Sequence, residues 1–160
     1  MTTPSIYEYQ AKSIDGQMIN MSDFKGKKMM IVNTASKCGF TPQYEALQKL
    51  HQTHGDKLVI LGFPSGNFLR QEFKTEDKIA QFCKARFGVT FQLFSKVSVK
   101  GKLQHPIFKW LSTKALNGTN NKAPSWNFCK YLINEDGQVE KFLGSRVDPM
   151  GKEVLSFVSK

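Results

Sequence analysis

Two apolar runs in the first half of the chain constrain the fold most strongly. Met29–Val32 and Leu58–Phe63 contain no charged or strongly polar side chain, which is typical of strands that are buried on both faces. Between the two runs, apolar residues of the segment Pro42–His54 recur at helical spacing, and Gly55 is a common helix end. This order predicts a β-α-β crossover in the middle of a sheet.

The rest of the chain extends this alternation of strands and helices. The patterns predict a hairpin over 6–19 around the turn Asp15-Gly16, a helix from Thr75, a strand over 89–94, a hairpin over 126–143 and a last helix from Pro149. We therefore expect a thioredoxin-like three-layer α/β sandwich, in which a central mixed β-sheet is flanked by helices and preceded by an N-terminal β-hairpin. The length of 160 residues predicts one domain over 1–160.

Cys38 lies between the first apolar run and the first predicted helix. Thr41 and Pro42 are predicted as the N-cap and the first-turn proline of that helix. Backbone N–H groups and the helix dipole favour negative charge at such a position, so a thiol there ionises more easily, and Lys37 acts in the same direction. The hypothesis is a nucleophilic thiolate, and a buried, inert cysteine is the alternative.

The residues after Cys38 narrow the thiol chemistry. A dithiol oxidoreductase needs a second cysteine three positions on, where the chain has Thr41, so the C-x-x-C pattern is not met. A single thiolate suits peroxide reduction, because it attacks the O–O bond, becomes a sulfenic acid and is then resolved by another thiol. Such a site needs hydrogen-bond donors around the sulfur, and amide and indole N–H groups donate without acting as bases.

Three segments resemble the motifs of the glutathione peroxidase family. They are Asn33–Tyr44 around Cys38, Leu61–Pro64 with Phe68–Glu72, and Trp126–Phe128. The likeness also includes Gly88–Phe91 and His105-Pro106, so it covers nearly the whole chain. It implies a thiol peroxidase that reduces hydrogen peroxide and organic or lipid hydroperoxides. Cys38 would be the peroxidatic residue, and the polar roles around it would be taken by Gln71, Trp126 and Asn127.

The same resemblance implies a role for Cys83. Phe82-Cys83 is similar to the context of the resolving cysteine in family members that use thioredoxin, so we expect a Cys38–Cys83 disulfide as the oxidised intermediate. A disulfide needs Cα atoms within about 7 Å, so a Cys83 packed inside its helix requires that helix to unwind partly. The alternative is a core cysteine at this position, with glutathione as the reductant. Cys129 is expected to pack.

The chain departs from the family pattern at three places. Ser65-Gly66-Asn67 stands where the family commonly has Cys-Asn-Gln, so that segment carries no redox thiol. Phe73 replaces a usual proline after the second motif. Gln92 replaces the proline expected between Phe91 and Leu93, where this fold often has a cis peptide bond, and a cis bond before a residue other than proline costs about 3 kcal/mol.

Composition excludes several classes of protein. The net charge of +10 comes from scattered Lys and Arg residues without a nucleic-acid-binding signature, and no apolar run is long enough to span a membrane. No cluster has metal-ligand spacing, so we expect no metal, haem or flavin cofactor. Three cysteines, and no signal peptide at Met1–Ser5, predict a cytoplasmic protein. The oligomerisation insertion of some animal members is absent before Trp126, which predicts a monomer.

The sequence leaves one alternative function open and disfavours another. A peroxide-sensing redox relay would pass a disulfide through Cys83 to a partner protein, with turnover secondary. A peroxiredoxin is disfavoured, because the pattern Pro-x-x-x-Thr-x-x-Cys is not met before Cys38.

Overall fold

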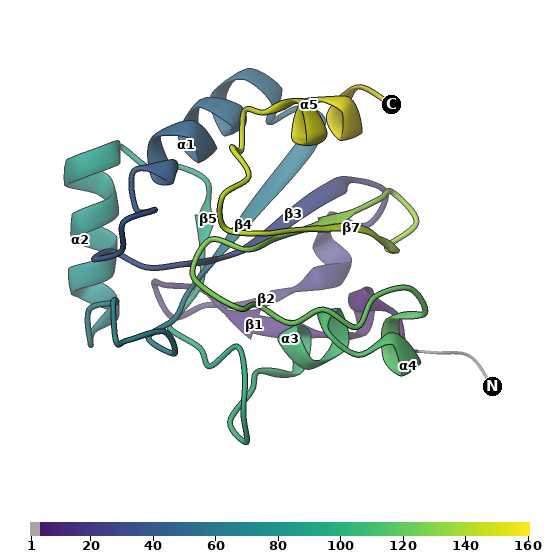
Figure 1. The fold of residues 1–160 in the computed structure, drawn as a ribbon, viewed down its shortest axis with the longest axis horizontal. Helices are drawn as coiled ribbons and strands as arrows, with labels where there is room; N and C mark the ends of the chain where they lie inside the picture. Colours follow the sequence, from purple (N-terminus) through teal and green to yellow (C-terminus); the bar gives the residue numbers. More distant parts are fainter. Residues whose placement is uncertain (1–3) are drawn as a thin grey trace.

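The computed structural model describes residues 4–160, so Met1–Thr3 of the predicted leaderless N-terminus lie outside the described residues. It contains a five-stranded and a two-stranded sheet (Figure 1). The strands are β1 (Gln10–Lys12), β2 (Met18–Asn20), β3 (Lys28–Thr34), β4 (Leu58–Pro64), β5 (Gln92–Leu93), β6 (Lys130–Ile133) and β7 (Val139–Leu143). The α-helices are α1 (Gln43–His54), α2 (Glu76–Phe87), α3 (Pro106–Leu111), α4 (Lys114–Asn117) and α5 (Lys152–Ser159).

The large sheet has the strand order β5-β4-β3-β6-β7 and is mixed. β3 pairs in parallel with β4, from Lys28 opposite Leu58 to Thr34 opposite Pro64, and α1 makes the crossover between them. β6 pairs antiparallel with β3 on its other side, and β7 pairs antiparallel with β6. The β-α-β unit predicted from the two apolar runs is therefore at the centre of the sheet.

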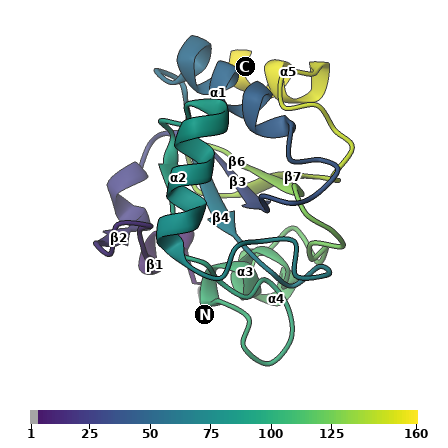
Figure 2. The same cartoon turned by 90° about the vertical axis from the view of Figure 1, so that its left-hand side faces the viewer.

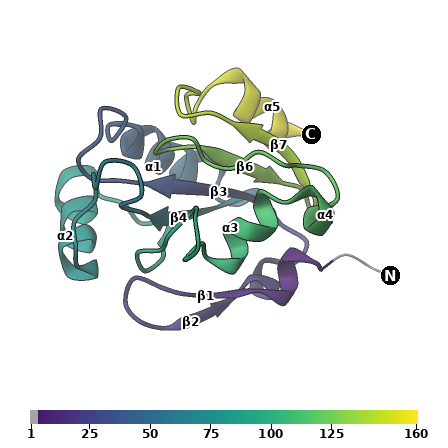
Figure 3. The same cartoon turned by 60° about the horizontal axis from the view of Figure 1, so that its bottom comes forward.

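Alternate residues of β3 pack into two cores on opposite faces of the sheet. Met30 and Val32 pack in the core under α1, α2 and α5, whereas Met29 and Ile31 pack against α3 and the β1–β2 hairpin. This is the period-two alternation of a strand covered on both faces. Figures 2 and 3 show the helices α1 and α5 on one side of the sheet, and α3 with the hairpin on the other. The prediction of a thioredoxin-like three-layer fold is confirmed.

Two strands are shorter than predicted. The hairpin begins only at Gln10, because Ile6–Glu8 form a 3-10 turn that is closed by a capping box between Ser5 and Glu8. The strand expected over 89–94 is reduced to β5, since only Gln92 and Leu93 pair with β4. The apolar pattern allows longer strands in both places. Local hydrogen bonds shorten the first strand, and the position of β5 at the sheet edge shortens the second.

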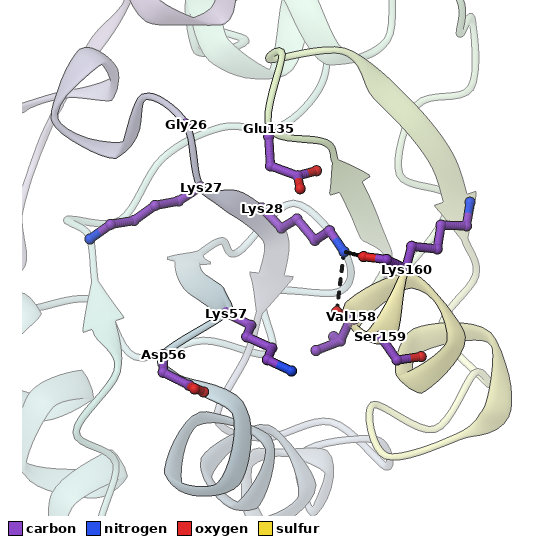
Figure 4. A pocket seen from close by; sticks show the side chains of 9 residues that line it. All are labelled: Gly26, Lys27, Lys28, Asp56, Lys57, Glu135, Val158, Ser159 and Lys160. Carbon is purple, nitrogen blue, oxygen red and sulfur yellow. Dashed lines mark hydrogen bonds between the residues drawn. The ribbon is translucent and has the colours of Figure 1, made fainter.

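Lys28 ties the C-terminal helix to the start of β3 (Figure 4). Its side chain is buried, and Nζ donates to the carbonyl oxygens of Phe157, Val158 and Lys160 at 2.8, 3.1 and 3.0 Å. A cation at the C-terminal end of a helix satisfies its free carbonyls and complements its dipole. The adjoining hollow of about 290 Å³ has lysines and acidic residues in its lining, and it lies at the end of β3 opposite to Cys38. Among residues 4–160, no helix is long and apolar enough to cross a bilayer.

Candidate active site

Cys38 lies in the loop that joins the end of β3 to α1, and 9% of its surface is exposed. The backbone N–H of Cys38 donates to Thr41 Oγ1 at 2.9 Å, and the same hydroxyl donates to the carbonyl oxygen of Ala35 at 2.8 Å. The prediction that Thr41 caps the helix is wrong, because its hydroxyl is used to close the cysteine loop. Pro42 precedes α1 without a side-chain cap.

The sulfur of Cys38 accepts a hydrogen bond from the backbone N–H of Phe40 at 3.4 Å. Phe40 lies in the turns that precede α1, two residues before its N-cap Pro42. A donor on sulfur favours its negatively charged form over the neutral thiol. The sequence predicted this environment from the helix start, but it did not identify Phe40 as the donor.

Gln71 and Asn127 are brought together from segments 56 positions apart. Asn127 is fully buried, and its Nδ2 donates to Gln71 Oε1 at 3.0 Å. This bond orients the Gln71 amide so that its NH₂ group points away from Asn127. The backbone N–H of Lys37 donates to the carbonyl oxygen of Gln71 at 2.9 Å, so the Gln71 loop lies against the residue before Cys38.

Asn33, the penultimate residue of β3, holds the segment that contains the third motif. Its Nδ2 donates to the carbonyl oxygen of Trp126 at 2.9 Å, and its Oδ1 accepts the N–H of Cys129 at 2.9 Å. The backbone of Phe128 has φ +64°, and its N–H donates to the Asn33 carbonyl oxygen at 2.6 Å. Asn33 belongs to the first sequence motif, but the motif alone does not indicate its role. A polar side chain in a strand that is otherwise apolar was the signal that it had one.

Trp126 is half-buried and packs against Phe68, with ring centroids 5.5 Å apart. Its indole N–H has no hydrogen-bond partner within residues 4–160. Among these residues, the Cys38 sulfur accepts no hydrogen bond from any of the three predicted donors, Gln71, Trp126 and Asn127. The amide of Asn127 is occupied by Gln71, which leaves the Gln71 NH₂ group and the Trp126 indole as free donors.

Cys83 is buried in α2, with 1% of its surface exposed. Burial raises the pKa of its thiol to about 11; the nearby Tyr44 hydroxyl opposes this shift, and the charge of Glu72 adds to it. All three cysteines are free and buried in this structure, and Cys129 packs as predicted, with its sulfur 3.7 Å from Ser145 Oγ. Cys83 lines a hollow of about 330 Å³ between α2 and the β1–β2 hairpin, and Cys38 does not contribute to it.

Two further hollows flank the Cys38 loop. One, of about 490 Å³, is lined by Phe40, Trp126 and Arg146. The other, of about 480 Å³, is lined by Lys37 and by residues on both sides of Gln71. Within residues 4–160, no group of three His, Cys, Asp or Glu side chains is arranged to hold a metal ion.

Comparison with known proteins gives consistent results for family and fold. A sequence model described as "Glutathione peroxidase" matches residues 6–112. The chain is 43% identical over 146 residues to a glutathione peroxidase of Lactococcus lactis, covering 91% of this chain and 92% of the relative. It is 43% identical over 153 residues to a hydroperoxy fatty acid reductase of Synechocystis (91% and 89% covered), and 37% identical over 161 residues to glutathione peroxidase-like peroxiredoxin 2 of Saccharomyces cerevisiae (99% of each).

Solved structures resemble the chain over its full length. The crystal structure of Trgpx in apo form has a TM-score of 0.73 and 30% identity, covering 99% of this chain and 98% of that one. A DsbF structure from M. tuberculosis has a TM-score of 0.66 at 14% identity, covering 99% and 98%, and it supports the thioredoxin-like fold alone.

Proposed function

Because the chain belongs to the glutathione peroxidase family and is a peroxidase of that type, we propose that Cys38 is the thiol that reduces the hydroperoxide. The observation that carries this proposal is the placement of the Cys38 sulfur. It accepts a hydrogen bond from the Phe40 N–H in the turns before α1, and it lies in a loop whose Lys37 N–H donates to the Gln71 carbonyl oxygen.

The proposed first step transfers one oxygen atom to sulfur. The Cys38 thiolate attacks the terminal oxygen of the hydroperoxide, an S–O bond forms and the O–O bond breaks. The leaving alkoxide takes up a proton and departs as an alcohol, or as water when the substrate is hydrogen peroxide. The free NH₂ group of Gln71 and the indole N–H of Trp126 are the proposed donors to the developing negative charge. Asn127 then acts as a positioning residue, since it holds the Gln71 amide.

The proposed second step uses Cys83 as the resolving thiol. Its sulfur attacks the sulfenic acid of Cys38, the S–S bond forms and water leaves. Because Cys83 is 1% exposed inside α2, this step requires local opening of that helix before the two sulfurs meet. Thioredoxin would then reduce the disulfide; if Cys83 does not reach Cys38, glutathione would reduce the sulfenic acid directly.

The names of two relatives support the proposed substrate and the proposed use of a protein thiol. The Synechocystis relative is named as a hydroperoxy fatty acid reductase and the yeast relative as a glutathione peroxidase-like peroxiredoxin. The first name favours fatty acid hydroperoxides as substrates of this chain, and the second is compatible with reduction of the peroxide by a protein thiol.

Mass spectrometry after a stoichiometric peroxide pulse tests the cycle. The wild type is expected to form the Cys38–Cys83 linkage, Cys83→Ser to retain Cys38 as a sulfenic acid trapped by dimedone, and Cys38→Ser to consume no peroxide. Cys129→Ser is the matched control, because Cys129 is also buried but has no part in the proposal. Full peroxide consumption by Cys38→Ser would refute the assignment of the peroxidatic thiol.

A further inference from the structure

A strongly cationic hollow adjoins the Cys38 loop. We call it the cationic pocket; its volume is about 480 Å³, and its five basic residues are Lys37, Arg70, Lys74, Lys78 and Lys96. They come from the cysteine loop, the loop after β4, the first turn of α2 and the segment after β5. Segments far apart in the sequence thus contribute the same sign of charge to one concave site.

None of the five basic groups of this pocket forms an ion pair within the part of the chain that the structure describes. The one ion pair within residues 4–160 joins Lys160 to Glu140, so no carboxylate lies within 4 Å of any of the five basic groups. Glu72 is the one acidic side chain in the lining. It is 3% exposed, and burial raises its pKa, although hydrogen bonds and the charge of Lys96 oppose this shift. Glu76, close by, uses its carboxylate to accept the backbone N–H of Lys96.

Like charges in a concave site repel one another and attract anions. Even when Glu72 is ionised and the nearby Glu76 is counted, the five basic side chains outnumber these two carboxylates. Four of the five are lysines, whose ammonium groups bind anionic oxygens as point charges and whose stems cover apolar surface. Lys37 Nζ lies 4.5 Å from the centroid of the Phe73 ring, so the pocket also offers an apolar wall next to its charges.

Two residues that line the pocket are direct sequence neighbours of Cys38 and Gln71. Lys37 directly precedes Cys38, and Arg70 directly precedes Gln71. The hydrogen bond from the Lys37 N–H to the Gln71 carbonyl oxygen, at 2.9 Å, joins the two loops. The pocket therefore lies next to the two loops that carry Cys38 and Gln71.

We propose that the cationic pocket binds the carboxylate of an anionic hydroperoxide, so that the enzyme favours such substrates over neutral hydroperoxides of the same size. This proposal rests on the peroxidase function of Cys38 proposed above. The carboxylate of the substrate binds to the basic groups and contributes binding energy away from the reacting oxygens. The apolar chain of the substrate contacts Phe73 and the lysine stems.

The test compares the hydroperoxide of linoleic acid with its methyl ester in the same nonionic detergent, which removes the charge and changes little else. The readout is the ratio of kcat/KM for the acid to kcat/KM for the ester. In Lys78→Gln/Lys96→Gln this ratio is expected to fall about three- to tenfold, the range for two partly exposed charge interactions. Lys37 and Arg70 are left intact, because they adjoin Cys38 and Gln71.

A matched variant, Lys109→Gln/Lys141→Gln, removes the same charge from exposed positions outside the pocket and is expected to leave the ratio within about twofold of the wild type. Raising the ionic strength should also lower the wild-type ratio, because salt screens exposed charges. An equal ratio in the wild type and both variants would overturn the pocket proposal, as would an equal fall in the two variants. If the wild type reduces neither hydroperoxide, the proposed peroxidase function itself has failed.

Discussion

The reactivity of Cys83 gives the sharpest test of how this structure controls its thiols. The perturbation is alkylation of the native, reduced protein by iodoacetamide. Burial raises the pKa of Cys83 from an ordinary 9.0 to about 11, and the thiolate is the form that reacts. At pH 8 the thiolate fraction is then about 0.1%, against about 10% for an unshifted thiol. The difference predicts labelling that is at least about 100-fold slower, before steric protection by α2 is counted.

The assay follows the peptide that contains Cys83 by mass spectrometry after timed alkylation, in native protein and in urea. The variant Ile79→Ala provides a second arm, since Ile79 is fully buried one turn before Cys83. A cavity there destabilises the packing of α2 by about 2–5 kcal/mol, so local opening and Cys83 labelling should both become faster. Wild-type labelling within about tenfold of the rate in urea would refute the reasoning, as would labelling that is insensitive to Ile79→Ala.

Three further substitutions test the supports of the site and the fold. Asn33→Ala leaves the Cys129 N–H and the Trp126 carbonyl unpaired. It should lower the free energy of unfolding, measured in urea, by about 2–4 kcal/mol, and it should also lower kcat/KM. An unchanged free energy of unfolding would contradict this. Burial lowers the pKa of Lys130 from 10.5 to about 8. The folded chain therefore binds fewer protons than the unfolded chain between these values, and the contribution of Lys130 to stability rises with pH there. From pH 7 to pH 9 the wild type should gain about 1 kcal/mol relative to Lys130→Met, so parallel stability curves would be the opposing result. In Gly137→Ala the new side chain sits on a backbone with φ +80°, and its Cβ lies only 2.7 Å from the Tyr7 ring. This strain should lower the free energy of unfolding by about 1–3 kcal/mol. A Tm equal to that of the wild type would contradict it.

The central part of the fold was predictable because its signals are local and strong. The apolar runs that became β3 and β4 have no polar face, and the helical spacing between them identified α1. The strand predicted over 89–94 was overestimated, because an apolar run does not reveal how many of its residues find a pairing partner at a sheet edge. The error at Thr41 has a similar cause, since a hydroxyl before a helix can close a preceding loop instead of capping the helix.

The sequence by itself determined the family, the central β-α-β unit and a set of candidate residues, namely Cys38, Gln71, Trp126, Asn127 and Cys83. These follow from residue types at fixed spacings along the chain. That they act as proposed stays a prediction.

Only the tertiary structure decided which groups contact one another. It assigned the hydrogen bond on the sulfur to the Phe40 N–H, joined Asn127 to Gln71, and buried Cys83. It also gathered Lys37, Lys78 and Lys96 with two other basic residues around one hollow. Such contacts depend on how β3, α2 and the loops between strands pack in three dimensions, and linear spacing does not encode the direction in which a side chain points after the chain has folded.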